Sequence, residues 1–305
     1  MATTTASAFD RFDRIITPAP VVRRKVPGRR DAVVAALARS FPPGSDIEYR
    51  SCRIFGSLTR GTAVSTAADV DLLTHLFVAA DAWEGRFRTD SAAFLRRIHL
   101  ALEPTFTVAR KAHPQRVRLL YPDGLNVDVA AVVRYDTGDY RIPDGFGHWR
   151  ITDPDADDAH LDRRRAALGG GLGRIVRLAK QWKLVHDVRL RSFHLEMLMS
   201  RTFSVLTDDS GRDLELFFCY NHGNLSVRAA GGHEDLAHYL TRRERIAIHA
   251  HMDEAWKRAV SANEAERQGD HTEAIRLWQG VLGRGFPDHA SPAGQTSGIS
   301  RRAPS

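Results

Sequence analysis

Three aspartates on two predicted strands constrain the fold of this chain more than any other feature. Asp69 and Asp71 stand two apart within residues 68–77 (ADVDLLTHLF), and Asp128 interrupts the apolar run 125–133 (LNVDVAAVV). Side chains two apart on a strand point to the same face, so the first two carboxylates project side by side. A lone aspartate in a buried strand is costly unless a cation offsets it, and a metal ion is the obvious candidate. The pattern therefore predicts a sheet that brings Asp128 beside the Asp69–Asp71 pair.

A Gly-Ser pair follows the strand predicted at 47–55 (IEYRSCRIF). Gly56 lets the backbone approach a phosphate, and Ser57 adds a hydroxyl and a backbone N–H for phosphate oxygens. Phosphoryl transfer requires mainly positioning and charge neutralisation, and two magnesium ions held by carboxylates supply both. We therefore interpret the three aspartates as catalytic ligands of two Mg²⁺ or Mn²⁺ ions. Each motif alone is common, and only their order along the chain makes the interpretation specific.

The first half of the chain is predicted to be a helix-flanked, mixed or antiparallel sheet. Residues 1–20 are polar and short of core residues, and a helix is expected at 31–41 with Asp31 as its N-cap. Another helix is expected at 91–102. Further extended segments are expected at 105–110 and 116–121.

The second half is predicted to be helical. The expected helices cover residues 161–186, 192–206, 211–220, 234–240, 242–268 and 270–282. Gly169-Gly170-Gly171 follows no strand, so we interpret it as a bend or break rather than a phosphate-binding loop. The predicted organisation is α/β: a palm domain at 1–150 that includes an N-terminal helix, a helical lobe at 151–285, and a disordered tail at 286–305.

Composition limits the partners and the compartment. A formal net charge of +7 and a pI of about 9.8 favour anionic partners without choosing among them. Cys52 and Cys219 form no C-x-x-C, which argues against a thiolate zinc site. The sequence contains no apolar run of about 18 residues and does not start with a secretory signal pattern, so we expect a cytoplasmic protein without a membrane partner.

Together, these motifs resemble the DNA polymerase β-like nucleotidyltransferase superfamily. Residues 56–62 (GSLTRGT) are similar to the G-S-x-x-R-G-T of bacterial cGAS/DncV-like nucleotidyltransferases, which are relatives of oligoadenylate synthetase. Similar segments follow at 140–143 (YRIP), 148–149 (HW), 152–154 (TDP), 176–182 (VRLAKQW), 192–196 (SFHLE) and 269–287. The resemblance spans roughly residues 45–287.

The resemblance implies a nucleotidyltransferase palm joined to an all-helical lobe, with the active site in the cleft between them. It also implies a set of nucleotide-binding residues: Gly56, Ser57, Arg60, Thr62, Lys180, Ser192 and Phe193. In this set Lys180 and Ser192 hold the donor triphosphate, and Phe193 stacks on a base. From the residues alone, a solvated helix charge at Lys180 and a core aromatic at Phe193 remain open.

The activity that the resemblance implies joins nucleoside triphosphates into a cyclic di- or trinucleotide with release of pyrophosphate. The implied setting is anti-phage signalling, in which the product activates a separate effector. A transferase acting on RNA, protein or a small molecule such as an antibiotic is an open alternative. So is a non-catalytic nucleotide- or RNA-binding module, although three carboxylates repel phosphate unless a metal intervenes. A regulatory partner protein and a nucleic-acid activator also stay open.

Overall fold

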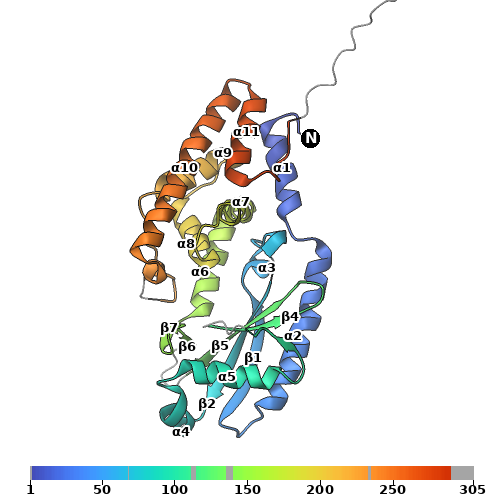
Figure 1. Ribbon diagram of the computed structural model, residues 1–305, viewed down its shortest axis with the longest axis vertical. Coiled ribbons are helices and arrows are strands. Elements are labelled where there is room, and N and C mark those ends of the chain that lie inside the picture. The colour runs from blue at the N-terminus through green and yellow to red at the C-terminus, as the bar shows by residue number, and fades with distance from the viewer. Residues whose placement is uncertain (1, 68, 111–114, 135–139, 233–234, 290–305) are drawn as a thin grey trace, which may run out of the picture.

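The computed structural model describes residues 2–67, 69–110, 115–134, 140–232 and 235–289. These residues form two lobes, an α/β palm and a helical lobe, joined by the segment that leads from the last strand into the first helix of the helical lobe (Figure 1). The predicted fold class is therefore confirmed.

The palm is built on one seven-stranded sheet in the order β1-β2-β5-β4-β3, and β6 pairs with β5 and β7. The strands are β1 (Ile47–Phe55), β2 (Val70–Val78), β3 (Thr107–Val108), β4 (Val117–Leu120), β5 (Val127–Arg134), β6 (Tyr140–Pro143) and β7 (Trp149–Thr152). Only the β2–β5 pair is parallel among the described strand pairs. The register places Asp71 directly beside Asp128 on the two central strands.

Two helices, α2 (Pro20–Ser40) and α5 (Ser91–Leu102), pack against this sheet and against each other. Their apolar side chains bury the palm core with those of the central strands. The helix expected at 31–41 begins eleven residues earlier, at Pro20, and continues through Pro27. Asp31 is therefore not an N-cap. Buried Val26 and Arg29 anchor the early turns to the palm, so that tertiary packing overrides the local propensity.

Short helices complete the palm. They are α3 (Ser57–Arg60), η1 (Ser65–Ala67), α4 (Ala80–Ala82) and η2 (Trp83–Phe87).

The helical lobe follows the palm in sequence. Its elements are α6 (Pro154–Leu168), α7 (Gly171–Val185), α8 (Ser192–Thr202), α9 (Ser210–Asn221), η3 (Leu236–Tyr239), α10 (Arg242–Arg267) and α11 (His271–Leu282). Asp153 caps α6 by accepting hydrogen bonds from the backbone N–H groups of Asp155 and Ala156. The long helix predicted at 161–186 is broken between α6 and α7. Gly169 there has a φ of +70°, a conformation that favours glycine.

The N-terminal helix α1 (Thr5–Ile16) belongs to the helical lobe rather than to the palm (Figure 1). Phe9 is buried with its ring centroid 5.0 Å from that of Trp278 and 5.0 Å from that of Phe286. The expectation that residues 1–20 lack core residues was therefore wrong. Phe286, expected in the tail, is also buried in this core, whereas residues 290–305 lie outside the described residues. None of the described helices is long and apolar enough to cross a membrane.

Candidate active site

A cleft of about 630 Å³ lies between the two lobes and is lined by residues of both. It gathers the predicted site residues, apart from Thr62: Gly56, Ser57, Arg60, Asp69, Asp71, Asp128, Lys180, Ser192 and Phe193. The chain therefore brings together, in one cavity, side chains that are up to 137 positions apart in sequence, from Gly56 to Phe193.

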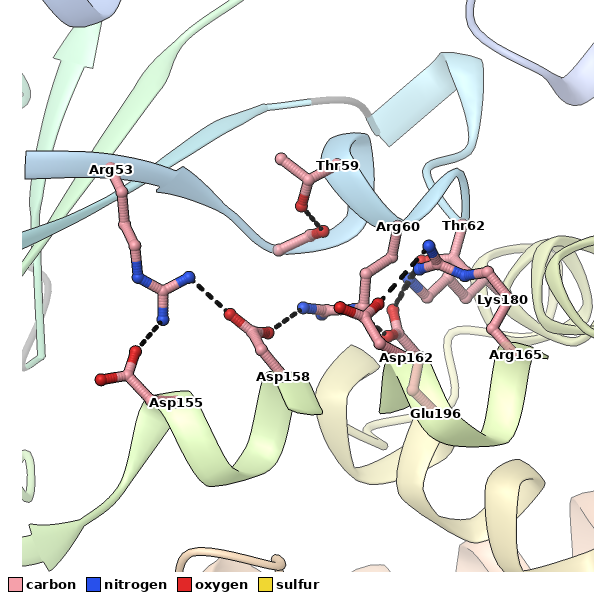
Figure 2. A network of polar contacts seen from close by, with 11 residues as sticks. Arg53, Thr59, Arg60, Thr62, Asp155, Asp158, Asp162, Arg165, Lys180 and Glu196 are labelled. Carbon is pink, nitrogen blue, oxygen red and sulfur yellow. Dashed lines mark hydrogen bonds and ion pairs between the residues drawn. The ribbon is translucent and has the colours of Figure 1, made fainter. Parts of the chain in front are cut away.

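The loop after β1 passes against strand β2 at Gly56. Its backbone has a φ of +83°, and a Cβ built on it would lie 2.3 Å from Oδ2 of Asp71. Two independent reasons therefore require glycine at this position: the backbone conformation and the close approach of a carboxylate. The Thr59 hydroxyl donates to the Gly56 carbonyl at 2.8 Å and fixes the turn, as Figure 2 shows.

Two arginines, Arg118 in β4 and Arg116 immediately before it, contact the carboxylates. Arg118 stands opposite Asp128 in the β4–β5 register and donates to both of its oxygens, each at 2.8 Å. The same guanidinium donates to Asp69 at 2.7 Å. Nε of Arg116 lies 2.9 Å from Oδ2 of Asp128, but its N–H does not point at that oxygen. The cation expected to offset buried Asp128 is therefore, in this structure, supplied by arginine.

Burial acts on the two carboxylates of the Asp-x-Asp motif. For Asp71, burial and then the charge of Asp128 raise the pKa to about 6. Burial also raises the pKa of Asp69, although the charge of Arg118 opposes it. Both carboxylates therefore ionise less readily than an exposed aspartate does. A cation bound beside them would stabilise their ionised form.

The donor set fits a hard divalent cation. Three carboxylates at the ends of adjacent central strands provide the oxygen ligands that Mg²⁺ prefers. Within the described ranges, however, no group of three His, Cys, Asp or Glu side chains is already gathered to hold an ion. The arginine contacts of Asp69 and Asp128 account for this difference, since their oxygens point at Arg118.

On the opposite wall, Lys180 of α7 lines the cleft and is paired with an acid of the helical lobe. Its ammonium is buried and bonded to Glu196 of α8, and it lies 3.3 Å from the hydroxyl of Thr62 (Figure 2). Thr62 itself donates to Glu196 at 2.8 Å and is buried away from the cleft, so the structure gives it no direct access to a nucleotide. The loop turns into the lobe interface after Gly61, which adopts the left-handed conformation.

Lys183, one helical turn beyond Lys180, was not predicted and also lines the cleft. Its ammonium lies 3.3 Å from the hydroxyl of Ser192, and burial followed by the charge of Lys180 lowers its pKa. An anion bound beside Lys183 would offset both the burial and the repulsion from Lys180, because it stabilises the charged ammonium. Ser192 is exposed, and half-buried Phe193 beside it packs on the helical core. The spacing of three residues from Lys180 on a helix, which places both lysines on one face, was a signal that could have identified Lys183.

Arg60 links the two lobes from the same loop. It donates to Glu196 of α8 at 2.8 Å and to Asp158 of α6 at 2.9 Å. Arg53 of β1 extends the network with a 2.6 Å bond to the same Asp158 (Figure 2). Burial would raise the pKa of Glu196, but the charges of Lys180 and Arg60 outweigh it and lower the value to about 2. Arg60 thus lines the cleft while its Nε and Nη1 groups donate to acidic side chains of the helical lobe.

Comparison with known proteins assigns this arrangement to a family. Residues 3–164, about half of the chain, match the sequence profile of the Second Messenger Oligonucleotide or Dinucleotide Synthetase domain. A Bacillus cereus (strain VD146) protein named probable cyclic nucleotide synthase is 28% identical over 162 residues. That match covers 51% of this chain and 48% of the relative, so the chain spans about half the length of the curated relative it matches.

Solved structures share the fold over almost the whole chain. CdnC of E. coli MS115-1 with ATP has a TM-score of 0.72 at 17% identity, covering 92% of this chain and 98% of that one. The same protein in a complex with HORMA-deltaN gives 0.70 at 18%, covering 92% and 97%. The CD-NTase CdnG of Bradyrhizobium diazoefficiens, in complex with GTP, gives 0.69 at 14%, covering 90% and 98%.

Proposed function

Since this chain belongs to the second messenger oligonucleotide or dinucleotide synthetases, a family of nucleotidyltransferase enzymes, we propose that it joins nucleoside triphosphates into a cyclic di- or trinucleotide. One observation carries the proposal. Asp71 and Asp128 stand in register on adjacent parallel strands, and the Gly56 loop lies against Asp71 in a cleft that the helical lobe closes from the other side. This is the placement that transfer of a nucleotidyl group requires.

In each step a ribose hydroxyl of the acceptor attacks the α-phosphorus of the donor. The new O–P bond forms as the bond to the pyrophosphate oxygen breaks, and pyrophosphate leaves. Asp69, Asp71 and Asp128 would hold two Mg²⁺ or Mn²⁺ ions, whose chemistry there would be to neutralise charge and to lower the pKa of the attacking hydroxyl. Asp128, the most buried of the three, accepts the proton of that hydroxyl.

The remaining residues bind and orient the donor. Ser57 presents its hydroxyl to the phosphates from the palm. Lys183 and Ser192 hold the triphosphate from the helical lobe, with Lys183 taking the role first expected of Lys180. Phe193 offers an aromatic face to a base.

The charge of the cleft favours an anionic acceptor. Arg116, Arg150 and Arg191 line the cleft, and Arg116 lies beside Asp128, the acceptor-side carboxylate of this proposal. A nucleotide acceptor gains from these guanidinium groups, whereas a cationic antibiotic is repelled. RNA and protein acceptors remain the second candidate, because they too can present anionic groups to these arginines.

The deciding experiment is product analysis. Purified protein is incubated with all four nucleoside triphosphates and Mg²⁺ or Mn²⁺, and the products are identified by mass spectrometry. We expect cyclic oligonucleotides from the wild type. The folded double variant Asp69→Asn/Asp71→Asn should give none, because the site loses two anionic ligands. Wild-type turnover in that double variant would contradict the assignment of the aspartates.

We further propose a signalling role in the cytoplasm. The product would act on a separate effector in anti-phage defence, which needs no stable contact with this chain. A regulatory partner protein is supported by the E. coli CdnC structure that contains HORMA-deltaN. Co-expression with proteins encoded beside this chain, followed by pull-down and activity measurement, tests for such a partner.

A further inference from the structure

Arg118 occupies the oxygens that the catalytic carboxylates would offer to a metal. It makes three contacts of 2.7–2.8 Å, two to Asp128 and one to Asp69. The fork on Asp128 is bidentate, the strongest geometry between guanidinium and carboxylate. Because Arg118 and Asp128 are direct cross-strand partners, the sheet itself sets this contact.

The need for this cation follows from burial. Asp128 is only 2% exposed, and a buried carboxylate without a counter-charge is strongly unfavourable. Asp69 and Asp71 add two more carboxylates to the same end of the sheet. The side chain of Arg118, in contrast, is 33% exposed, so it can swing into solvent without burying its own charge.

Arg116 is the weaker of the two partners. Its single 2.9 Å contact with Asp128 is not aligned as a hydrogen bond, and its guanidinium lines the cleft. Arg116 and Arg118 are two positions apart and so lie on the same face of the strand, but the geometry of their contacts shows that Arg118 is the stronger partner of Asp128.

We propose that Arg118 is a built-in counter-ion that competes with divalent metal for Asp69 and Asp128. This inference rests on the proposed function, since it assigns metal binding to these carboxylates. With Arg118 in place, the folded chain keeps its buried carboxylates neutralised and has low affinity for a free divalent ion. Loading requires Arg118 to leave, which is favoured when the phosphates of a nucleotide contribute further ligands for the metal.

The test measures Mn²⁺ binding without nucleotide, by electron paramagnetic resonance of the free ion. Arg118→Gln removes the competing charge, and we expect its Mn²⁺ affinity to exceed that of the wild type about tenfold or more. Arg116→Gln should change the affinity less. Arg96→Gln is the control: its side chain is 65% exposed and pairs with Asp90 on the palm surface, so it alters net charge by the same amount elsewhere.

Stability gives a second, independent readout. In EDTA the melting temperature of Arg118→Gln should fall below that of the wild type, and Mn²⁺ should raise it by more than it raises the wild type. Arg118→Lys keeps the charge but cannot form the fork, so its Mn²⁺ affinity should lie between the two. This variant keeps the test decisive if Arg118→Gln does not fold.

Equal Mn²⁺ affinity in the wild type, Arg118→Gln and Arg118→Lys would overturn the proposal. Adding Asp128→Asn to Arg118→Gln should abolish the gain, and a gain that persists would place the metal elsewhere and also overturn it. Product formation by the wild type tests the proposed function separately. Loss of that function with a tenfold gain in Mn²⁺ affinity would leave the counter-ion in place and remove only the assigned reaction.

Discussion

Gly56 illustrates how one residue sets the geometry of the site. Its φ of +83° lies in the region that side chains with a Cβ rarely adopt, and its α-carbon faces the carboxylate of Asp71. The turn therefore brings the backbone of the loop against strand β2. Any larger residue must push apart the two segments that would grip the nucleotide.

Gly56→Ala should destroy product formation and lower the melting temperature. The added methyl would lie 2.3 Å from Oδ2 of Asp71, in addition to a backbone strain of roughly 1–3 kcal/mol. Gly124→Ala is the matched control, because Gly124 also has a positive φ, +76°, but nothing lies within 4 Å of its added Cβ. Similar activities in the two variants would show that contact with Asp71 is unimportant.

The two lysines of α7 should respond differently to truncation. Lys183→Ala should weaken binding of ATP, measured by calorimetry, because it removes an ammonium that faces the cleft. Lys180→Ala should mainly lower the melting temperature by removing one of the two cations that pair with buried Glu196. If Lys180→Ala instead loses ATP affinity with unchanged stability, Lys180 is the phosphate ligand and the assignment of Lys183 is wrong.

At the scale of elements, helix α1 is the least expected part of the fold. Its buried residues Ala8, Phe9, Phe12 and Ile16 recur along one face, and they pack on α7 and α11 of the distant half of the chain. The N-terminus is thereby fixed to the helical lobe, while the next helix, α2, packs on the palm (Figure 1). One continuous segment ties both lobes from outside the cleft.

Phe12→Ala should therefore destabilise the helical lobe by about 3–5 kcal/mol, the usual effect of emptying a buried aromatic site. Phe12 is 1% exposed, and its ring centroid lies 5.2 Å from that of Phe286. Urea unfolding followed by tryptophan fluorescence measures the change. Ile15→Ala, on the same helix but 52% exposed, serves as the control and should lie close to the wild type. Equal losses in both variants would argue that α1 contributes only its helical propensity.

The elements differ in how well the sequence predicted them, for physical reasons. The central strands β2 and β5 carry long apolar runs and were predicted within three residues at each end, and the more polar edge strand β1 was predicted at its observed bounds. The β6–β7 hairpin has only four residues per strand and no such run, so its pairing depends on the end of β5. Helix α1 was missed although its apolar spacing was a usable signal.

The candidate site divides in the same way. The aspartates and the Gly-Ser turn were predictable because their local pattern is tied to their chemistry. The partners of Lys180 and Thr62 were not, since these two residues are 118 positions apart, and only the fold brings them within 3.3 Å of each other and against the shared carboxylate of Glu196. The Arg116–Val117–Arg118 alternation was visible in the sequence, but only the strand order shows that it faces Asp128.

At the scale of the whole molecule, a polar network joins the palm to the helical lobe along the wall of the cleft. Glu196 of α8 accepts hydrogen bonds from Arg60 and Thr62 of the palm loop and from Lys180 of α7 (Figure 2). Asp158 of α6 adds contacts to Arg53 and Arg60. Because the same loop carries Gly56 and Ser57, the network fixes the turn that we propose to bind phosphate relative to the helical wall. The relative position of the lobes is thus coupled to the charge on Glu196.

Glu196→Gln should lower the free energy of unfolding at neutral pH by several kcal/mol, because it leaves buried Lys180 without its anion and removes one of the two acids that pair with Arg60. The pH dependence identifies the cause. The pKa of Glu196 is about 2 in the folded protein and 4.5 in an unperturbed chain, so its ionisation stabilises the fold above pH 4.5. This stabilisation, on the order of 3 kcal/mol, is lost as the pH falls from 4.5 toward 2.

Urea unfolding of the wild type and Glu196→Gln between pH 3 and 7 measures that loss. The difference between their unfolding free energies should be constant above about pH 5 and should shrink steadily below it. Glu254→Gln is the control, since Glu254 is 59% exposed in a surface pair with Arg258 and should show a small difference at every pH. A difference for Glu196→Gln that stays constant down to pH 3 would mean that its charge does not hold the lobes together. In that case packing around α8 would be the main link between palm and helical lobe, and product formation should then survive the substitution.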